Sequence, residues 1–292
     1  CKTENLSLAS YSASALQTRP SGMPGFTVIG TGDDWRTQTD VVIFDWSPVL
    51  EHFAARNPLV RFGSGLSAML GFIFSGTLFR YLKTSWRYGL FFAYPLVLLV
   101  ACLLFGFVAA HIAGYGVAGL LAGLLIFVSA LTFATWKAHL LLMMDDWAFA
   151  SSLATGNHSL IEETLKTFRS NLEAELEGSE GENLVIGHSL GCIFAVDALS
   201  SSVTSKHKLA SLMTTGSSLL KIALDQRAGW LRKSIGDLVK SDVHWLDVQS
   251  LTDTISFYGS NPAVSSGFDS PPGLKTLRIR FRAMLSPQTY AK

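Results

Sequence analysis

The longest hydrophobic stretches of the chain lie in its first half and come as a pair. Residues 89–110 and 117–136 contain no charged side chain. At ~1.5 Å per residue in a helix, each stretch is long enough to cross a hydrocarbon core of ~30 Å. Residues 111–116 between them are too few for a domain. The pattern therefore predicts a transmembrane helical hairpin over residues 89–136, with both ends on the same side of the membrane.

Basic residues flank this hairpin, and its short link carries no Lys, Arg, Asp or Glu. Arg80, Lys83 and Arg87 precede the first span, and Lys137 follows the second. Lys and Arg accumulate on the cytoplasmic side of membrane proteins. We therefore expect a multi-pass protein of the inner (cytoplasmic) membrane, with its remaining parts in the cytoplasm. The preceding segment, residues 61–88, is interrupted by Gly and Ser, so we expect an interfacial helix there rather than a third crossing.

Shorter patterns on both sides of the hairpin indicate a sheet with helices. Spaced apolar residues predict an amphipathic helix over 159–177. Runs rich in β-branched and aromatic residues predict strands at 26–30, 41–46, 184–186, 209–215, 243–251 and 275–281. The first two are expected to be buried neighbours in one sheet. We expect a three-layer α/β domain from residues 26–60 and 143–292, interrupted by the hairpin and preceded by a poorly defined segment, 1–25.

One pentapeptide carries the strongest candidate chemistry. Residues 187–191 read Gly-His-Ser-Leu-Gly, a G-x-S-x-G pattern between the strand at 184–186 and an apolar helix at 192–199. In this context the serine occupies a tight turn and its hydroxyl points outward. We therefore predict Ser189 as a nucleophile. The backbone N–H of Leu190 is expected to form half of an oxyanion hole.

This pentapeptide resembles the nucleophile elbow of the α/β-hydrolase superfamily, lipases and esterases especially. The chain from about Phe26 onward is also similar to an uncharacterised group of bacterial membrane-embedded α/β-hydrolases. The closer similarity rests on residues 40–46, 85–96, 144–150, 216–224 and 251–258. The resemblance implies a serine hydrolase whose catalytic groups follow in the order Ser, acid, His.

Asp253 is the predicted acid. It comes at the carboxyl end of the strand at 243–251, where catalytic groups gather in an open α/β sheet. Asp247 lies within that strand, and Asp225 lies in a predicted helix. A Thr-Asp turn cap is the alternative explanation for Asp253.

The expected histidine is missing after the acid. The chain has seven histidines: His52, His111, His139, His158, His188, His207 and His244. None follows Asp253, and His188 is expected to flank the serine rather than face it. We expect a chain truncated at both ends, because a first strand before Phe26 is also missing. The other interpretation is a protein that does not work as a hydrolase, and a histidine after Lys292 in a longer reading frame would favour the enzyme.

Composition limits the other possibilities. The charged fraction of 15% and mean hydropathy of +0.33 favour a membrane protein. A net charge of +1, without an arginine-rich patch, argues against nucleic acid as a partner. The three cysteines, Cys1, Cys102 and Cys192, form no metal-binding or disulfide pattern. No cofactor or metal is expected, and the adjacent pair Asp145 and Asp146 is interpreted as a solvated helix turn.

The sequence thus predicts a membrane-anchored serine hydrolase that cleaves an ester or acyl bond through a covalent acyl-enzyme. A position close to the lipid bilayer suggests lipid-like acyl substrates. The alternative is a catalytically inactive hydrolase-like domain that serves as a membrane scaffold. Cys1 also allows a lipoprotein, but a fragment of a longer reading frame is the preferred explanation. Oligomeric state does not follow from these patterns.

Overall fold

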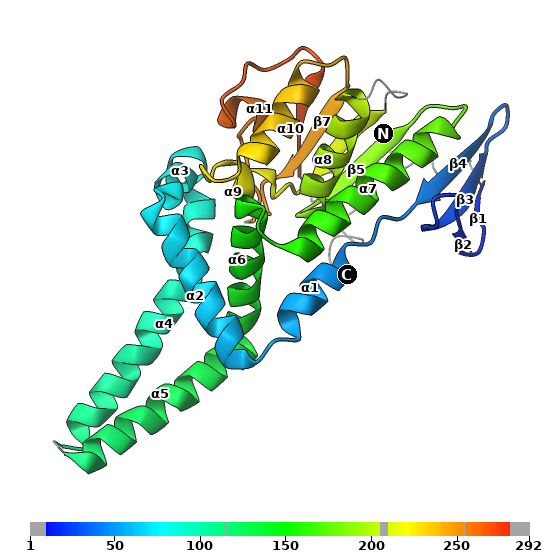
Figure 1. Ribbon diagram of the computed structural model, residues 1–292. Helices are drawn as coiled ribbons and strands as arrows, with labels where there is room; N and C mark the ends of the chain where they lie inside the picture. Colours follow the sequence, from blue (N-terminus) through cyan, green and yellow to red (C-terminus); the bar gives the residue numbers. More distant parts are fainter. Residues whose placement is uncertain (1–9, 115, 205–209, 254, 281–292) are drawn as a thin grey trace.

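The computed structural model describes residues 10–114, 116–204, 210–253 and 255–280. It is a mixed α/β protein with a parallel sheet (Figure 1). The predictions that concern Cys1 and the residues near Lys292 lie outside the described residues.

The N-terminal strands form an antiparallel sheet of their own. It contains β1 (Ser10–Ala13), β2 (Gln17–Thr18), β3 (Pro24–Thr31) and β4 (Arg36–Val42). The predicted pairing of the runs at 26–30 and 41–46 is confirmed in part, because β3 and β4 are antiparallel neighbours but β4 ends at Val42, so residues 43–46 are not in a strand. The predicted burial of the run 41–46 is wrong, since Ile43 and Asp45 are exposed and its other four residues are only partly buried. Two strands also lie within the segment 1–25, because Ser10–Ala13 and Gln17–Thr18 both pair with β3.

A group of helices follows, comprising α1 (Ser47–Ala54), α2 (Pro58–Phe74), α3 (Thr77–Thr84) and, later in the chain, α6 (Leu140–Thr155). The segment 61–88 is therefore not a single interfacial helix. Gly76 adopts a left-handed conformation with φ 73°, and α2 and α3 meet at an angle of 73° there. Glycine accepts this conformation without steric cost, so it permits the sharp bend. Taken as one broken span, α2 and α3 would be a third candidate membrane element.

The predicted hairpin consists of α4 (Trp86–Ile112) and α5 (Val117–Lys137). Both helices are long and apolar enough to cross a membrane. They project away from the parallel sheet (Figure 1). A Cβ at Gly123 would lie 2.7 Å from Ala110 Cβ and 2.8 Å from Gly106 O, so small residues allow the two backbones to approach closely. Large apolar side chains such as Phe107 and Leu120, 70% and 71% exposed, point outward along the hairpin.

The first turns of α4 belong to a buried aromatic cluster rather than to an exposed membrane surface. Phe92 and Trp147 are fully buried, with ring centroids 4.6 Å apart. Phe72 of α2 and Tyr81 of α3 pack against the same Trp147 ring. The hairpin is therefore continuous with the packed core at its base.

The interpretation of the adjacent carboxylates on α6 as a solvated turn is wrong. Asp145 is only 3% exposed, and its carboxylate accepts hydrogen bonds from the Arg61 guanidinium. Asp146 accepts from Lys221 Nζ, which is also 3% exposed. A buried charge requires a partner, so these pairs tie α6 to α2 and to α9 (Leu219–Ala223). No sequence pattern indicated the pairing, since Arg61 lies 84 residues from Asp145.

The second sheet is parallel, with strand order β5 (Leu184–His188), β6 (Ser211–Thr215), β7 (Trp245–Ser250) and β8 (Leu274–Ile279). The remaining helices are α7 (Ser159–Glu177), α8 (Gly191–Thr204), α10 (Gly229–Val239) and the short α11 (Pro262–Ser265). The strand and helix predictions for this part are confirmed within a few residues.

Only one face of this sheet is well covered in the described part of the chain. Leu212 and Trp245 are buried on the face that α8 packs against. On the opposite face, Leu184, Ile186 and Leu277 are 53%, 61% and 48% exposed. The expected three layers are thus two layers within the described residues.

A half-buried histidine, His158, directly precedes α7. The His158 ring lies 5.5 Å from that of His52 and 5.1 Å from that of Phe53, both on α1. Burial, and then the nearby charges of His52 and Arg56, lower the pKa of His158. The neutral ring is therefore favoured in the folded state.

This histidine should contribute stability above the unfolded imidazole pKa of about 6.5, and that stability should be lost as pH falls through the lower folded value. We expect the melting temperature in detergent micelles to decrease between pH 7.5 and pH 5, and His158→Phe to reduce the decrease. The exposed His244→Gln variant is the control. An unaltered pH dependence in His158→Phe would contradict this assignment.

Candidate active site

Ser189 lies in a strained turn between β5 and α8, as predicted. Its φ is 53°, one of two left-handed conformations outside glycine among the described residues. Serine pays a steric cost in this conformation, so its presence must be imposed by the surrounding packing. The Ser189 N–H donates to Thr215 O at 3.0 Å, and the Ser189 carbonyl accepts from Cys192 N at 3.2 Å. These bonds fix the turn and leave the hydroxyl at the carboxyl edge of the sheet.

The two glycines of the pentapeptide are explained by close contacts. A Cβ at Gly187 would lie 2.6 Å from Cys192 Cα, so the helix can pack on the strand only because that Cβ is absent. A Cβ at Gly191 would lie 3.3 Å from Trp46 Nε1. The Trp46 ring stacks on Phe149 and on Phe194, with centroid distances of 5.9 and 5.7 Å. Trp46 therefore covers the elbow, a role that the sequence analysis missed.

The immediate surroundings of the hydroxyl are polar. Ser189 Oγ lies 3.4 Å from Ser218 Oγ, and Ser218 N–H donates to Ser189 O at 3.2 Å. Within the described residues, the Leu190 N–H donates no hydrogen bond to the protein. This amide lies at the start of α8, where backbone N–H groups favour negative charge. The role of this N–H as half of an oxyanion hole stays a prediction.

Asp253 lies on the same edge of the sheet as the serine. Its Oδ1 accepts from Ile255 N at 3.0 Å. A Cβ at Gly216 would lie 3.0 Å from Asp253 Oδ2 and 3.7 Å from His188 Nε2. The carboxylate and this imidazole therefore flank the same glycine, which has a left-handed φ of 50°. The expectation that the His188 ring flanks the serine rather than facing it stays a prediction.

No hydrogen bond joins Ser189 and Asp253 among the described residues. Among the described residues, no histidine donates to or accepts from Ser189 Oγ. The described residues therefore supply a serine, an amide donor and a carboxylate, but not a positioned general base.

The competing carboxylates have structural partners. Asp247 is buried in β7, where it accepts from Thr214 Oγ1 and Gln249 Nε2, both at 2.7 Å. Asp225 is fully buried and accepts from the Arg227 guanidinium and from Thr77 Oγ1. The preference for Asp253 is consistent with these contacts.

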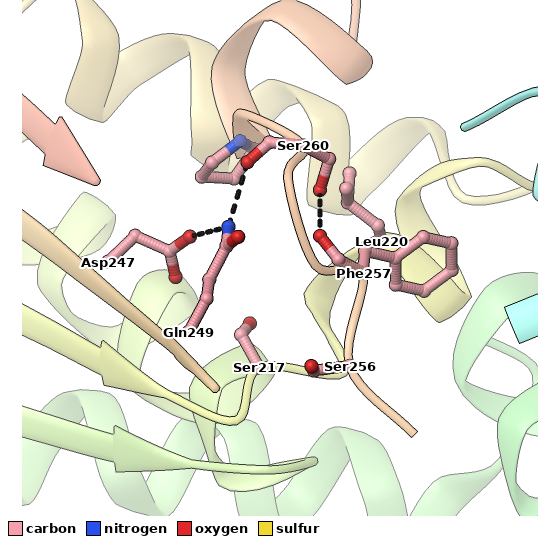
Figure 2. A pocket seen from close by; sticks show the side chains of 8 residues that line it. Ser217, Leu220, Asp247, Gln249, Ser256, Phe257 and Ser260 are labelled. Carbon is pink, nitrogen blue, oxygen red and sulfur yellow. Dashed lines mark hydrogen bonds between the residues drawn. The ribbon is translucent and has the colours of Figure 1, made fainter. Parts of the chain in front are cut away.

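A small cavity lies beside Asp247 but is separate from the serine. Figure 2 shows Gln249 bridging Asp247 and the Ser260 carbonyl across it, with Ser217 and Ser256 on its wall. Neither Ser189 nor Asp253 lines this cavity. Gln249 donates a hydrogen bond to the buried Asp247 carboxylate. We therefore interpret the cavity as a packing gap between the segments that follow β6 and β7.

The cysteine closest to the elbow is chemically silent. Burial raises the pKa of the Cys192 thiol to about 12, so the thiolate is not formed near neutral pH. Cys102 is also buried and free. No group of three His, Cys, Asp or Glu side chains that could hold a metal ion occurs among the described residues. Ser189 is thus the better nucleophile candidate at this edge.

Comparisons with known protein families, curated proteins and solved structures give no match to this chain.

Proposed function

We propose that the protein is a membrane-anchored serine hydrolase that cleaves an ester or acyl bond through a covalent acyl-enzyme. The observation that carries the proposal is the left-handed Ser189 between a parallel strand and a helix. A serine held in this conformation at a cost in stability is typical of a nucleophile elbow.

In this mechanism Ser189 Oγ attacks the acyl carbon. The imidazole of a histidine outside the described residues takes the proton of the hydroxyl. The oxyanion that forms accepts a hydrogen bond from the Leu190 N–H. Asp253 orients the imidazole and stabilises it when protonated. The leaving alcohol receives the proton, and water then hydrolyses the acyl-serine by the same route. No metal or cofactor is required in these steps.

The hairpin suggests where the reaction takes place. Two helices with lipid-compatible surfaces would anchor the site at a bilayer, and the basic flanks favour the cytoplasmic side of the inner membrane. The partner in this proposal is the lipid bilayer itself. A lipid-like acyl ester is then the substrate class with the highest local concentration.

A catalytically inactive scaffold is the competing function. The specific observation in its favour is that no histidine among the described residues forms a hydrogen bond with Ser189 Oγ. Such a protein would keep the elbow but form no acyl-enzyme.

An assay of acyl-chain length tests the substrate class. With the full-length protein in phospholipid vesicles, we expect kcat/KM for a long-chain p-nitrophenyl ester to exceed that for the acetate by at least about tenfold, since each buried CH2 contributes about 0.8 kcal/mol. Equal rates on both esters would contradict a lipid-like substrate. No hydrolysis of either ester, and no acylated Ser189 peptide by mass spectrometry, would favour the scaffold.

A further inference from the structure

The loop that carries Asp253 is held on both sides by the start of α4. Arg87 Nη1 donates a hydrogen bond to the Leu251 carbonyl at 3.1 Å. The Tyr88 ring stacks on Phe257, with centroids 4.0 Å apart and an angle of 24° between the planes. Two successive residues of one helix thus contact the loop before and after the candidate acid.

Between these two contacts, local hydrogen bonds fix the acid within the loop. The Asp253 N–H donates to Ser250 O at 3.3 Å, and the Asp253 carbonyl accepts from Ser256 Oγ at 3.2 Å. The carboxylate itself accepts from Ile255 N. The acid therefore cannot change its place without moving the segment that Arg87 and Tyr88 hold.

The contact between Tyr88 and Phe257 is buried, and it continues to the segment between β6 and α9, which contains Ser218. Tyr88 and Phe257 are only 1% and 3% exposed. Tyr81 of α3 also packs on Phe257, with ring centroids 5.8 Å apart, and its hydroxyl donates to the Lys221 carbonyl within α9. The chain enters α9 from Ser218, the neighbour of the candidate nucleophile. Helix α3 and the start of α4 thus contact both the segment that carries Asp253 and the helix that follows Ser218.

We propose that Arg87 and Tyr88 are positioning residues for Asp253. This inference rests on the proposed hydrolase function. Because α4 runs as one helix from Trp86 to Ile112, the helix that is apolar enough to enter the bilayer also sets the place of the acid. The membrane hairpin is then a structural part of the active site as well as an anchor.

A double-mutant cycle tests this role in the full-length protein in phosphatidylcholine vesicles. We expect Arg87→Gln to slow fluorophosphonate labelling of Ser189 at least about tenfold, because small misplacements of a catalytic group cost this much or more. In an Asp253→Asn background the same change should have no further effect. Lys83→Gln removes an exposed charge from the preceding helix and should leave the labelling rate unchanged in both backgrounds.

A second pair of variants separates the ring contact from folding. Tyr88→Phe retains the stacked ring and should label like the wild type, whereas Tyr88→Leu should slow labelling as Arg87→Gln does. An equal fold-loss for Arg87→Gln with and without the Asp253 carboxylate would overturn the positioning role. So would wild-type rates in both Arg87→Gln and Tyr88→Leu.

Hydrogen–deuterium exchange distinguishes a failure of this inference from a failure of the proposed function. If wild-type Ser189 is never labelled, the hydrolase proposal fails, and the loop can still be followed by exchange. Peptides containing Leu251 and Asp253 should exchange faster in Arg87→Gln than in Lys83→Gln. Identical exchange in these two variants would show that Arg87 does not hold the loop.

Discussion

Ser189→Ala is expected to abolish fluorophosphonate labelling of the full-length protein while leaving its fold intact. The hydroxyl is the proposed nucleophile, so its loss removes the atom that bonds to phosphorus. The variant loses only a 3.4 Å contact with Ser218 Oγ, and alanine keeps the backbone of the turn. Gel fluorescence measures the labelling, and circular dichroism spectra with melting curves measure the fold.

Ser218→Ala is the matched control for this experiment. It removes the other hydroxyl of the pair and should leave Ser189 labelling within a few-fold of the wild type. Persistent labelling of Ser189→Ala, or loss of labelling only in Ser218→Ala, would remove Ser189 from the mechanism.

Asp253→Asn should lower the labelling rate and the rate of ester hydrolysis by about 10²–10⁴-fold. An amide in this place cannot stabilise an imidazolium, and it presents an N–H where the imidazole needs an acceptor. The bond from Ile255 N to the side-chain oxygen can be retained, so little loss of stability is expected. The labelling rate is measured from reactions quenched at a series of times, and the hydrolysis rate is measured as an initial rate.

The exposed Asp242, which precedes β7 at the opposite end of the strand, provides the control. Asp242→Asn removes the same charge and should leave both rates unchanged. Equal rates in the Asp253→Asn variant and the wild type would leave the Thr-Asp turn cap as the explanation for this residue.

The elements that the sequence predicted well are those with a local cause. The helix over Ser159–Glu177 follows from its repeating apolar positions, and the two spans follow from uninterrupted hydrophobicity. The turn at Ser189 follows in part from Gly187, whose Cβ would collide with Cys192 of the next helix. In each case the deciding contacts lie within a few residues along the chain.

What the sequence did not predict depends on contacts between distant segments. No sequence pattern near Asp145 indicates that it pairs with Arg61. Likewise, no pattern near Asp253 indicates that Arg87 forms a hydrogen bond with the loop that carries this residue. Nothing in the sequence indicates that the His188 ring and the Asp253 carboxylate both lie near Gly216, which follows β6. The independent N-terminal sheet was missed because strands in separate sheets have the same local pattern as strands in one sheet.

The backbone conformation of Ser189 also has an evolutionary and engineering consequence. Glycine would occupy a φ of 53° without the steric cost of about 1–2 kcal/mol that a residue with a Cβ carries there. Selection for stability alone would therefore favour replacing the serine. A protein that keeps the hydroxyl at this position gives up part of its folding free energy, as expected where activity and stability oppose each other. Stabilising screens of this protein are thus expected to enrich glycine at the position that the chemistry requires to be serine.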